Sequence, residues 1–422
     1  MKLFLLLTFF VLGNTQEPLK RLAFGSCNKQ HLPQPIWGAI DTYNPDLWVW
    51  LGDVVYVDRL VFPGYFKPSS LERIQEQYNI QKNHSEYRKL ISKTSTIGVW
   101  VSSPVMQQAD RPQDDHDYGL NNAGGEIPFK DESQKIFLDF LDEPADSPRW
   151  NRKGVWGSYS YGPPGRRVKV ILLDVRYWRD PLGKIDGDIL GPEQWRWLDS
   201  ELEGSDAQVH LIGSGTQILP YDKPFQEKWV HYPGARDKLF EMINKHKTPG
   251  VILLSGDVHY AEFLKTDLVL TYPLWELTSS GMTHTCATQV PYLCSLALDR
   301  YFRSVYQQTD FFLEFNFGTI DFHWDSPDPF LQFTIRDTSN RIALERNVSL
   351  SSLQSREKEI VGEVIDPKYM IPVTAESYRT TILPILLLIL LSPLLCCLRK
   401  KRSNSTITSD PVKQQKKIKK DQ

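Results

Sequence analysis

The sequence predicts an α/β fold in which two β-sheets pack together and helices flank them. Short apolar runs alternate with segments of helical periodicity between residues 21 and 255, which is typical of a mostly parallel sheet. After Trp275 three strand-like runs follow one another without intervening helices, which indicates an antiparallel section. We expect these late strands to form a second sheet packed on the first.

The expected elements follow from the spacing of apolar residues along the chain. Apolar, β-branched runs predict strands at 21–26, 47–51, 97–101, 168–173, 208–213 and 251–255. Apolar residues at helical spacing predict helices at 71–91, 132–141, 192–202 and 235–245. The late strands are expected at 311–324, 330–336 and 341–348. The chain has no fixed-period repeat, so we expect neither a solenoid nor a propeller.

Two of the expected parallel strands end in the same way. Each is followed by a glycine and an aspartate, and a residue with a polar ring comes shortly afterwards. Tyr56 follows Asp53, and His259 follows Asp257. Because ligands bind at the carboxyl ends of strands in open α/β sheets, we expect these four side chains to converge. The loop 114–117 adds three aspartates around a histidine, and such carboxylates repel one another unless cations hold them. The sequence therefore predicts a metal site.

Composition excludes one class of function. The formal net charge is only −2 over 422 residues, so the body of the protein has no basic field to hold nucleic acid as a stable partner. Cysteine is sparse: Cys286 and Cys294 are candidates for a disulfide, which leaves Cys27 unpaired. An unpaired thiol in an oxidising compartment is a liability unless something such as a metal holds it.

Both ends of the chain are expected to address it to membranes. Residues 1–16 resemble a signal peptide, since Lys2 precedes a short apolar run. Residues 380–398 are apolar and long enough to form a transmembrane helix, and the basic tail 399–422 follows at once. Between them we expect the main folded domain at 17–349 and a lumenal stalk at 350–379. This predicts a type I single-pass protein of the endoplasmic reticulum or early secretory pathway, with its main domain lumenal.

Short motifs agree with that topology. Asn83 and Asn347 lie in acceptor sequences for N-glycosylation. Lys419 and Lys420 stand where the dilysine signal of endoplasmic reticulum membrane proteins stands, which would make a coat-protein retrieval receptor a partner. The alternative is a lysine-rich tail that binds anionic lipid. The lipid bilayer is an expected partner through residues 380–398.

Eight short motifs, taken together and in order, resemble one family. They are FGSCN at 24–28, GDVVY at 52–56, DDHDYG at 114–119, LDVRYWRD at 173–180, LGPEQWRWL at 190–198, SGDVHYAE at 255–262, LTSSGMTH at 277–284 and NFG at 316–318. Over roughly residues 20–325 the chain resembles the alkaline phosphatase D, or PhoD-like, branch of the calcineurin-type metallophosphatases. The resemblance implies a four-layer α/β/β/α sandwich and a phosphate ester substrate, either a phosphomonoester or a phosphodiester.

The resemblance also implies roles for particular residues. The implied metal ligands are Asp53 as the bridging carboxylate, Cys27 and Tyr56 at an iron site, Asp115, Asp257, His259 and, as a weaker candidate, Asn28. Two or more metal ions are implied, Fe³⁺ with Ca²⁺, or alternatively Zn²⁺, Mn²⁺ or Mg²⁺. A metal-bound hydroxide would attack the phosphorus. His116 would protonate the leaving group, and Arg176 would bind two phosphate oxygens.

Simpler interpretations remain open for several of these residues. Cys27 could be an ordinary buried thiol, Tyr56 a core aromatic, and Arg176 a partner of Asp174 or Asp180. His284 lies near the expected site without an assigned role.

One departure from the family pattern bears on activity. Residues 101–113 stand as an insertion before the acidic loop. If the insertion displaces Asp115 and His116 by about 1 Å, catalysis drops about a hundredfold. The alternative function is therefore a catalytically silent, membrane-anchored binding ectodomain. Activity that appears only after deletion of residues 101–113 would identify such a silent form.

Overall fold

The computed structural model describes residues 17–365, with gaps at 58, 63–64, 68, 101–123, 183, 185, 224–226, 290, 358–359 and 361. The expected signal peptide, transmembrane span and tail lie outside the described residues, as do Asp115, His116 and the insertion. Within the described part of the chain, no helix has both the length and the apolar character that crossing a bilayer requires.

The first sheet contains six strands in the order β14-β13-β12-β1-β2-β5. Its parallel half is β1 (Arg21–Gly25), β2 (Leu47–Leu51) and β5 (Ser95–Val99). Its antiparallel half is β12 (Phe317–His323), β13 (Phe330–Arg336) and β14 (Ile342–Ser349). β1 and β12 pair in antiparallel fashion and join the two halves.

The prediction that the late strands form a sheet of their own is therefore wrong. Apolar periodicity identifies strands but not their partners. β1 lies inside a sheet and needs a partner on each edge for its backbone groups; β12 supplies the second.

The second sheet also contains six strands, in the order β10-β11-β9-β8-β7-β6. Four of them are parallel neighbours: β7 (Val168–Leu173), β8 (Val209–Ser214), β9 (Val251–Ser255) and β11 (Leu274–Ser279). The antiparallel edges are β6 (Gly157–Tyr161) and β10 (Ala261–Thr266). Sequence reasoning missed β6, β10 and β11. β6 is GSYSY, in which small polar residues hide the strand pattern.

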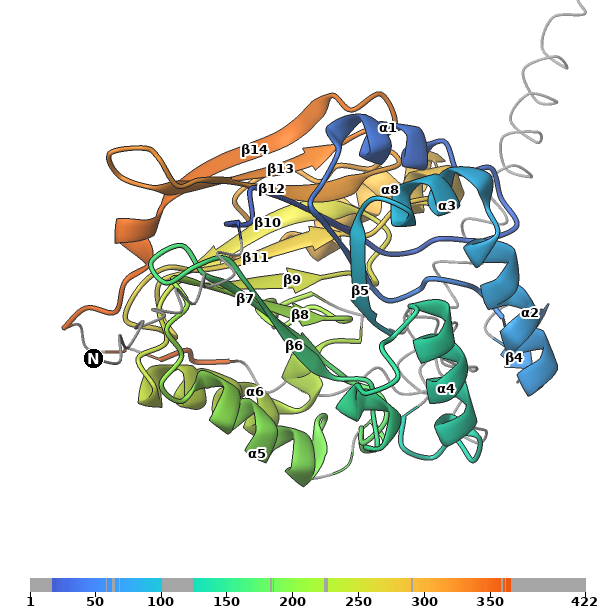
Figure 1. Cartoon of the computed structure of the whole chain (residues 1–422), viewed down its shortest axis with the longest axis horizontal. Coiled ribbons are helices and arrows are strands. Elements are labelled where there is room, and N and C mark those ends of the chain that lie inside the picture. The colour runs from blue at the N-terminus through green and yellow to red at the C-terminus, as the bar shows by residue number, and fades with distance from the viewer. Residues whose placement is uncertain are drawn as a thin grey trace, which may run out of the picture. The chain divides into compact units, whose positions relative to one another are not determined.

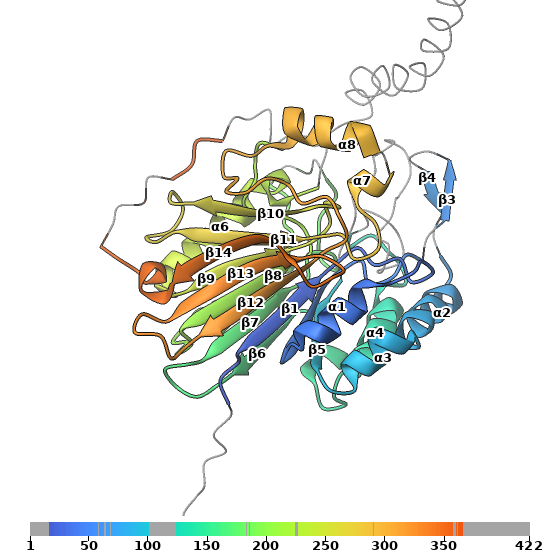
Figure 2. The ribbon, with the colours of Figure 1, turned by 90° about the horizontal axis from the view of Figure 1, so that it is seen from above.

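Helices flank the two sheets, as predicted. α5 (Gly191–Leu202) and α6 (Pro233–Lys245) lie beside the second sheet, while α1 (Ile36–Tyr43) packs on β2 through Trp37, 5.3 Å from the ring of Trp48 (Figure 1). α2 (Leu71–Lys82), α3 (Ser85–Ile91) and α4 (Lys130–Phe140) form a group next to β5 (Figure 2). A small hairpin, β3 (Arg59–Phe62) and β4 (Tyr65–Lys67), precedes α2.

The helix expected at 71–91 is in fact two helices. Asn83 donates from its amide side chain to the carbonyl of Asn79 (2.8 Å) and closes α2, and His84 is extended at the start of α3. Asparagine competes for backbone partners in this way, which a periodic apolar pattern does not reveal.

The start of the expected stalk contacts the domain. Leu350 and Leu353 are buried, and the amide of Gly250 donates to the carbonyl of Leu353 (2.9 Å).

The two sheets approach each other closely at Gly213 in β8. A Cβ atom at this position would lie 3.0 Å from Leu51 of β2 and 2.8 Å from Leu172 of β7. We expect Gly213→Ala to lower the free energy of unfolding by about 1–3 kcal/mol, because the sheets must separate to admit the methyl group. Gly38→Ala in α1 is the matched control, since a Cβ there meets nothing within 4 Å. Urea unfolding followed by tryptophan fluorescence compares the two; equal stabilities would contradict this packing.

Candidate metal centre

The first group of candidate ligands follows two neighbouring parallel strands. Cys27 follows β1 and Asp53 follows β2, and both are fully buried. The Cys27 thiol donates to Oδ2 of Asp53 (3.3 Å), and the hydroxyl of Tyr56 donates to the same oxygen (2.8 Å). Asp53 Oδ2 is thus the atom to which both a thiol and a phenol donate.

The second group follows β9, in the other sheet. Asp257 is fully buried, and His259 is half-buried. One ligand atom each of Cys27, Asp53 and His259 lies within 4.8 Å of the others. The two sheets therefore bring residues more than 200 positions apart into one cluster.

Gly256 allows that approach. A Cβ on this glycine would lie 2.4 Å from the Ser26 hydroxyl and 2.8 Å from the carbonyl oxygen of Leu51. Only a residue without a side chain fits between the ends of β1 and β2. The glycine that precedes Asp257 in the sequence motif is therefore required by the close approach of the two sheets.

Four of the candidate ligands have strained backbones. Cys27, Asp53, Asp257 and His259 have φ values of 62°, 47°, 80° and 61°. Residues other than glycine avoid this left-handed region, at a cost of about 1–3 kcal/mol each. Such strain is concentrated at functional sites, because surrounding packing must maintain it. The turns after the three strands bring the ligand atoms of Cys27, Asp53 and His259 together.

The buried acidic groups of the cluster have raised pKa values, which bound cations would lower. Burial, and then the charge of Asp53, raise the pKa values of the Cys27 thiol and the Tyr56 phenol well above their usual values. Burial raises the pKa of Asp257 well above its usual value, as do Asp53 and Glu227, against the opposing effect of Arg176. Cations bound among these groups would favour their charged forms and reverse these shifts.

Asp257 is the sharpest sign of a cation site. Among the described residues, neither of its carboxylate oxygens has a hydrogen-bond partner, although the side chain is fully buried. A buried carboxylate without donors costs several kcal/mol unless a cation compensates it. The donor set of carboxylates, imidazole, phenol and thiol suits transition-metal ions. The residues present therefore fit the metal centre that the resemblance implies.

Arg176 lies next to this cluster. Its guanidinium donates through Nη1 to both carboxylate oxygens of Glu227 (2.8 and 3.0 Å), whereas only its backbone amide donates to Asp174 (2.8 Å). The guanidinium therefore pairs with Glu227, and not with the Asp174 or Asp180 partners weighed from the sequence. Arg179 also lies 3.4 Å from Glu227. Sequence reasoning missed Glu227, since nothing in its local pattern marks it.

Three further residues belong to the surroundings of the site. His284 packs edge-on against His259 (ring centroids 4.6 Å apart) and Tyr56 (5.0 Å). The Ser280 hydroxyl lies 3.0 Å from the Cys27 sulfur and accepts from the amide of His259 (2.8 Å). Asn28 donates its amide to Val54 and Gln81, which leaves its buried Oδ1 without a hydrogen-bond donor. His284 and Ser280 lie in the LTSSGMTH motif, which was the signal available in the sequence.

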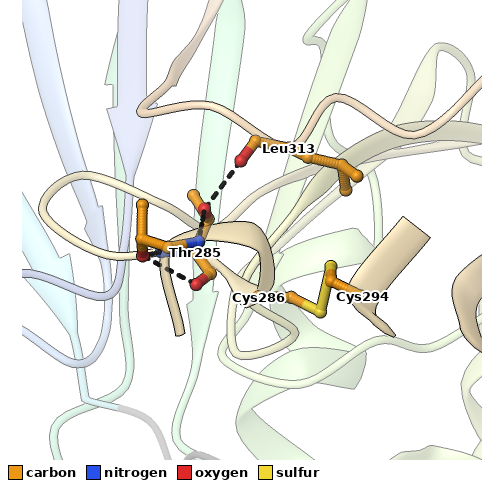
Figure 3. Close-up of a disulfide and its surroundings, with 5 residues drawn as sticks. Thr285, Cys286, Cys294 and Leu313 are labelled. Atoms are coloured by element: carbon orange, nitrogen blue, oxygen red, sulfur yellow. Dashed lines mark hydrogen bonds between the residues drawn. A yellow bond between two sulfur atoms is a disulfide. The ribbon is translucent and has the colours of Figure 1, made fainter. Parts of the chain in front are cut away.

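The other predicted positions can also be located. Asn83 and Asn347 are exposed, as glycosylation requires. Cys286 and Cys294 form a disulfide beside Thr285 (Figure 3), and the remaining described cysteine, Cys27, is free.

Two mixed sheets that gather aspartates, a thiol, a phenol and an imidazole at their strand ends define a metal-dependent hydrolase by fold and site. The chain belongs to the PhoD-like phosphatase family, whose profile matches residues 22–326, and this confirms the resemblance inferred from the motifs. It is therefore a hydrolase of the phosphatase class.

One solved structure shares the fold, and a second is similar at a lower score. The structure of PhoD matches with a TM-score of 0.55 at 16% identity, over 86% of this chain and 76% of that chain. A purple acid phosphatase from yellow lupin (Lupinus luteus) seeds matches with a TM-score of 0.47 at 13% identity, over 79% of this chain and 54% of that chain. No curated protein matches the chain by sequence.

Proposed function

We propose that the chain hydrolyses phosphate esters, phosphomonoesters or phosphodiesters, at a centre of two or more metal ions. The buried carboxylate of Asp257, which has no donor among the described residues, is the observation that carries the proposal, because a bound cation would compensate its charge. Asp53, Cys27 and Tyr56 would hold one ion, and Asp257, His259 and Asn28 would contribute to another. Bound there, the ions would activate water at neutral pH and neutralise phosphoryl charge.

The protein's own groups have distinct tasks in this proposal. Asp53 orders the site, since the Cys27 thiol and the Tyr56 hydroxyl both point at its Oδ2. Arg176 offers a planar fork for two phosphate oxygens, and Glu227 holds that fork in place before substrate binds. The leaving oxygen needs a proton, a task that the family resemblance gives to His116.

Iron at the Cys27–Tyr56 side gives a spectroscopic test. If Fe³⁺ binds the phenolate of Tyr56, we expect a visible charge-transfer band that Tyr56→Phe abolishes. Elemental analysis of the purified chain, run beside an aryl phosphate assay, gives the metal content. Tyr43→Phe is the control, because Tyr43 is a buried tyrosine that packs near Phe317 instead of at this site (ring centroids 6.3 Å apart). A colourless protein with full activity would remove the iron proposal and leave Ca²⁺, Zn²⁺, Mn²⁺ or Mg²⁺ as alternatives.

A further inference from the structure

A disulfide-closed segment covers the loop that carries Asp257 and His259. It runs from α7 (Cys286–Gln289) through α8 (Pro291–Ala297) and the π-helical turn Leu298–Phe302 to residue 306, and we call it the cap. The cap has a small apolar core of its own, in which Cys294 and Leu298 pack with Val258 and Tyr260. The amide of Cys286 donates to the carbonyl of His259 (2.9 Å). The cap is thus joined directly to the candidate metal centre.

The cap exposes three large apolar side chains among charged ones. Leu296, Tyr301 and Val305 are 67%, 57% and 69% exposed, and Asp299 and Arg303, which lie between them in the chain, are exposed as well. Exposed apolar residues that lie together mark contact sites. The Arg300 guanidinium lies 5.9 Å from the ring of Tyr301, so a cation and an amphipathic aromatic ring stand together on the cap.

The chain leaves the described domain beside the cap. Glu363 accepts from the hydroxyl of Tyr306 (2.5 Å) and from Nη1 of Arg236 (2.7 Å). The amide of Gly362 donates to Leu268 (3.1 Å), which fixes the path of the chain up to this point. The contact between Glu363 and Tyr306 places this end of the described chain next to the last residue of the cap.

The remaining connection to the predicted span is short. Residues 366–379 separate the described chain from the apolar stretch 380–398. A chain of this length reaches about 50 Å at most when fully extended. Such a tether would keep the cap near a bilayer that held the predicted span.

We propose that Leu296, Tyr301 and Val305 insert into the surface of the lipid bilayer that carries the chain. Tyrosine and arginine suit the interface between headgroups and acyl chains, and leucine and valine suit the acyl boundary. Because the cap is bonded to the loop of Asp257 and His259, the site then takes phosphate esters carried by membrane lipids. This last step rests on the proposed phosphatase function.

The test uses the full chain reconstituted into phosphatidylcholine vesicles that contain a photoactivatable diazirine phosphatidylcholine. We expect lipid adducts in two peptides: the span 380–398 and the cap region 294–306. Combining Leu296→Glu, Tyr301→Glu and Val305→Glu should lower the cap adducts about tenfold relative to those of the span. Ile342→Glu is the matched control, since Ile342 is 45% exposed on β14. It should leave the ratio unchanged.

Several outcomes would overturn the inference. Adducts in 380–398 alone show that the cap stays in water, and adducts in neither show that the anchor is absent. If lipid adducts in 294–306 fall as the density of protein in the vesicles rises, a second copy of the chain covers the cap in place of lipid. Labelling needs no turnover, so failure of the phosphatase proposal leaves this readout intact. For the substrate class, the triple variant should lose hydrolysis of phosphatidic acid in the vesicles and keep that of a soluble aryl phosphate; equal loss of both contradicts it.

Discussion

Asp53→Asn is expected to lower the turnover of an aryl phosphate about 1,000-fold or more, without unfolding the protein. The Asp53 carboxylate is fully buried, and the thiol of Cys27 and the hydroxyl of Tyr56 both donate to its Oδ2. Asparagine keeps the size of the side chain but removes its charge. The groups around it would then lack the anion that draws cations into the cluster.

The measurement pairs kcat/KM with metal content in the purified chain. Asp325→Asn serves as the control, because Asp325 is an exposed aspartate paired with Arg166 (2.7 Å). We expect the control to match the parent in both quantities. Unchanged turnover in Asp53→Asn, with the fold intact, would refute the assignment of the centre.

The sequence predicted most of the parallel core because its strands are buried on both sides. β2, β7 and β9 coincide with the expected runs to the residue, since each is almost wholly apolar, with Lys169 and Ser255 as the exceptions, and a glycine or an aspartate follows it. The same property indicated the candidate site. A parallel strand ends at a fixed edge of the sheet, so the residue types that follow it, as at Asp53 and Asp257, indicate ligand positions.

Features that depend on pairing between distant segments could not be predicted in this way. The pairing of β12 with β1 depends on hydrogen bonds between backbone groups of the two strands, which no pattern of side chains reveals. Glu227 reaches Arg176 across 51 positions, in a stretch with no recognisable motif. His284 and Ser280 lie in the motif LTSSGMTH, but their roles depend on contacts with His259 that only the fold creates.

The backbone strain at the candidate site bears on the alternative function, a catalytically silent binding ectodomain. A scaffold that had lost its chemistry would not need to keep four non-glycine ligands in strained left-handed conformations around one another. Residues 101–113, which motivated that alternative, lie outside the described residues. Strain at Cys27, Asp53, Asp257 and His259 therefore favours the enzyme.

Asp257→Asn is expected to change stability in opposite directions with and without metal. In the metal-free protein the buried carboxylate has no donor, so its replacement should raise the free energy of unfolding by about 1–3 kcal/mol at pH 7. In the metal-loaded protein the same change removes a ligand. The parent should gain about 2.7 kcal/mol when the free ion is 100 times its Kd, and the variant should gain much less.

The pH dependence has a definite sign. Burial raises the pKa of Asp257 in the folded state. Below the unfolded-state pKa of about 3.9 the carboxyl group is protonated in both states, so the metal-free parent keeps its full free energy of unfolding. As the pH rises above that value, this free energy falls. The advantage of Asp257→Asn should therefore vanish near pH 3 and grow toward neutrality. Thermal unfolding of the full chain in detergent, after chelation and after adding back metal ions, measures both effects.

Asp337→Asn is the matched control, because Asp337 is a buried aspartate whose carboxylate is fully supplied with donors. It accepts from the amides of Ser339 (2.8 Å) and Arg341 (3.0 Å) and from Nε of Arg341 (2.8 Å). Its replacement should destabilise the protein equally with and without metal. If Asp257→Asn behaves like Asp337→Asn, then the Asp257 carboxylate is stabilised by the protein alone and no cation is needed there. We expect the change in the free energy of unfolding to have opposite signs with and without metal for Asp257→Asn, and the same sign for Asp337→Asn. That result would identify the Asp257 carboxylate as a ligand of a bound cation.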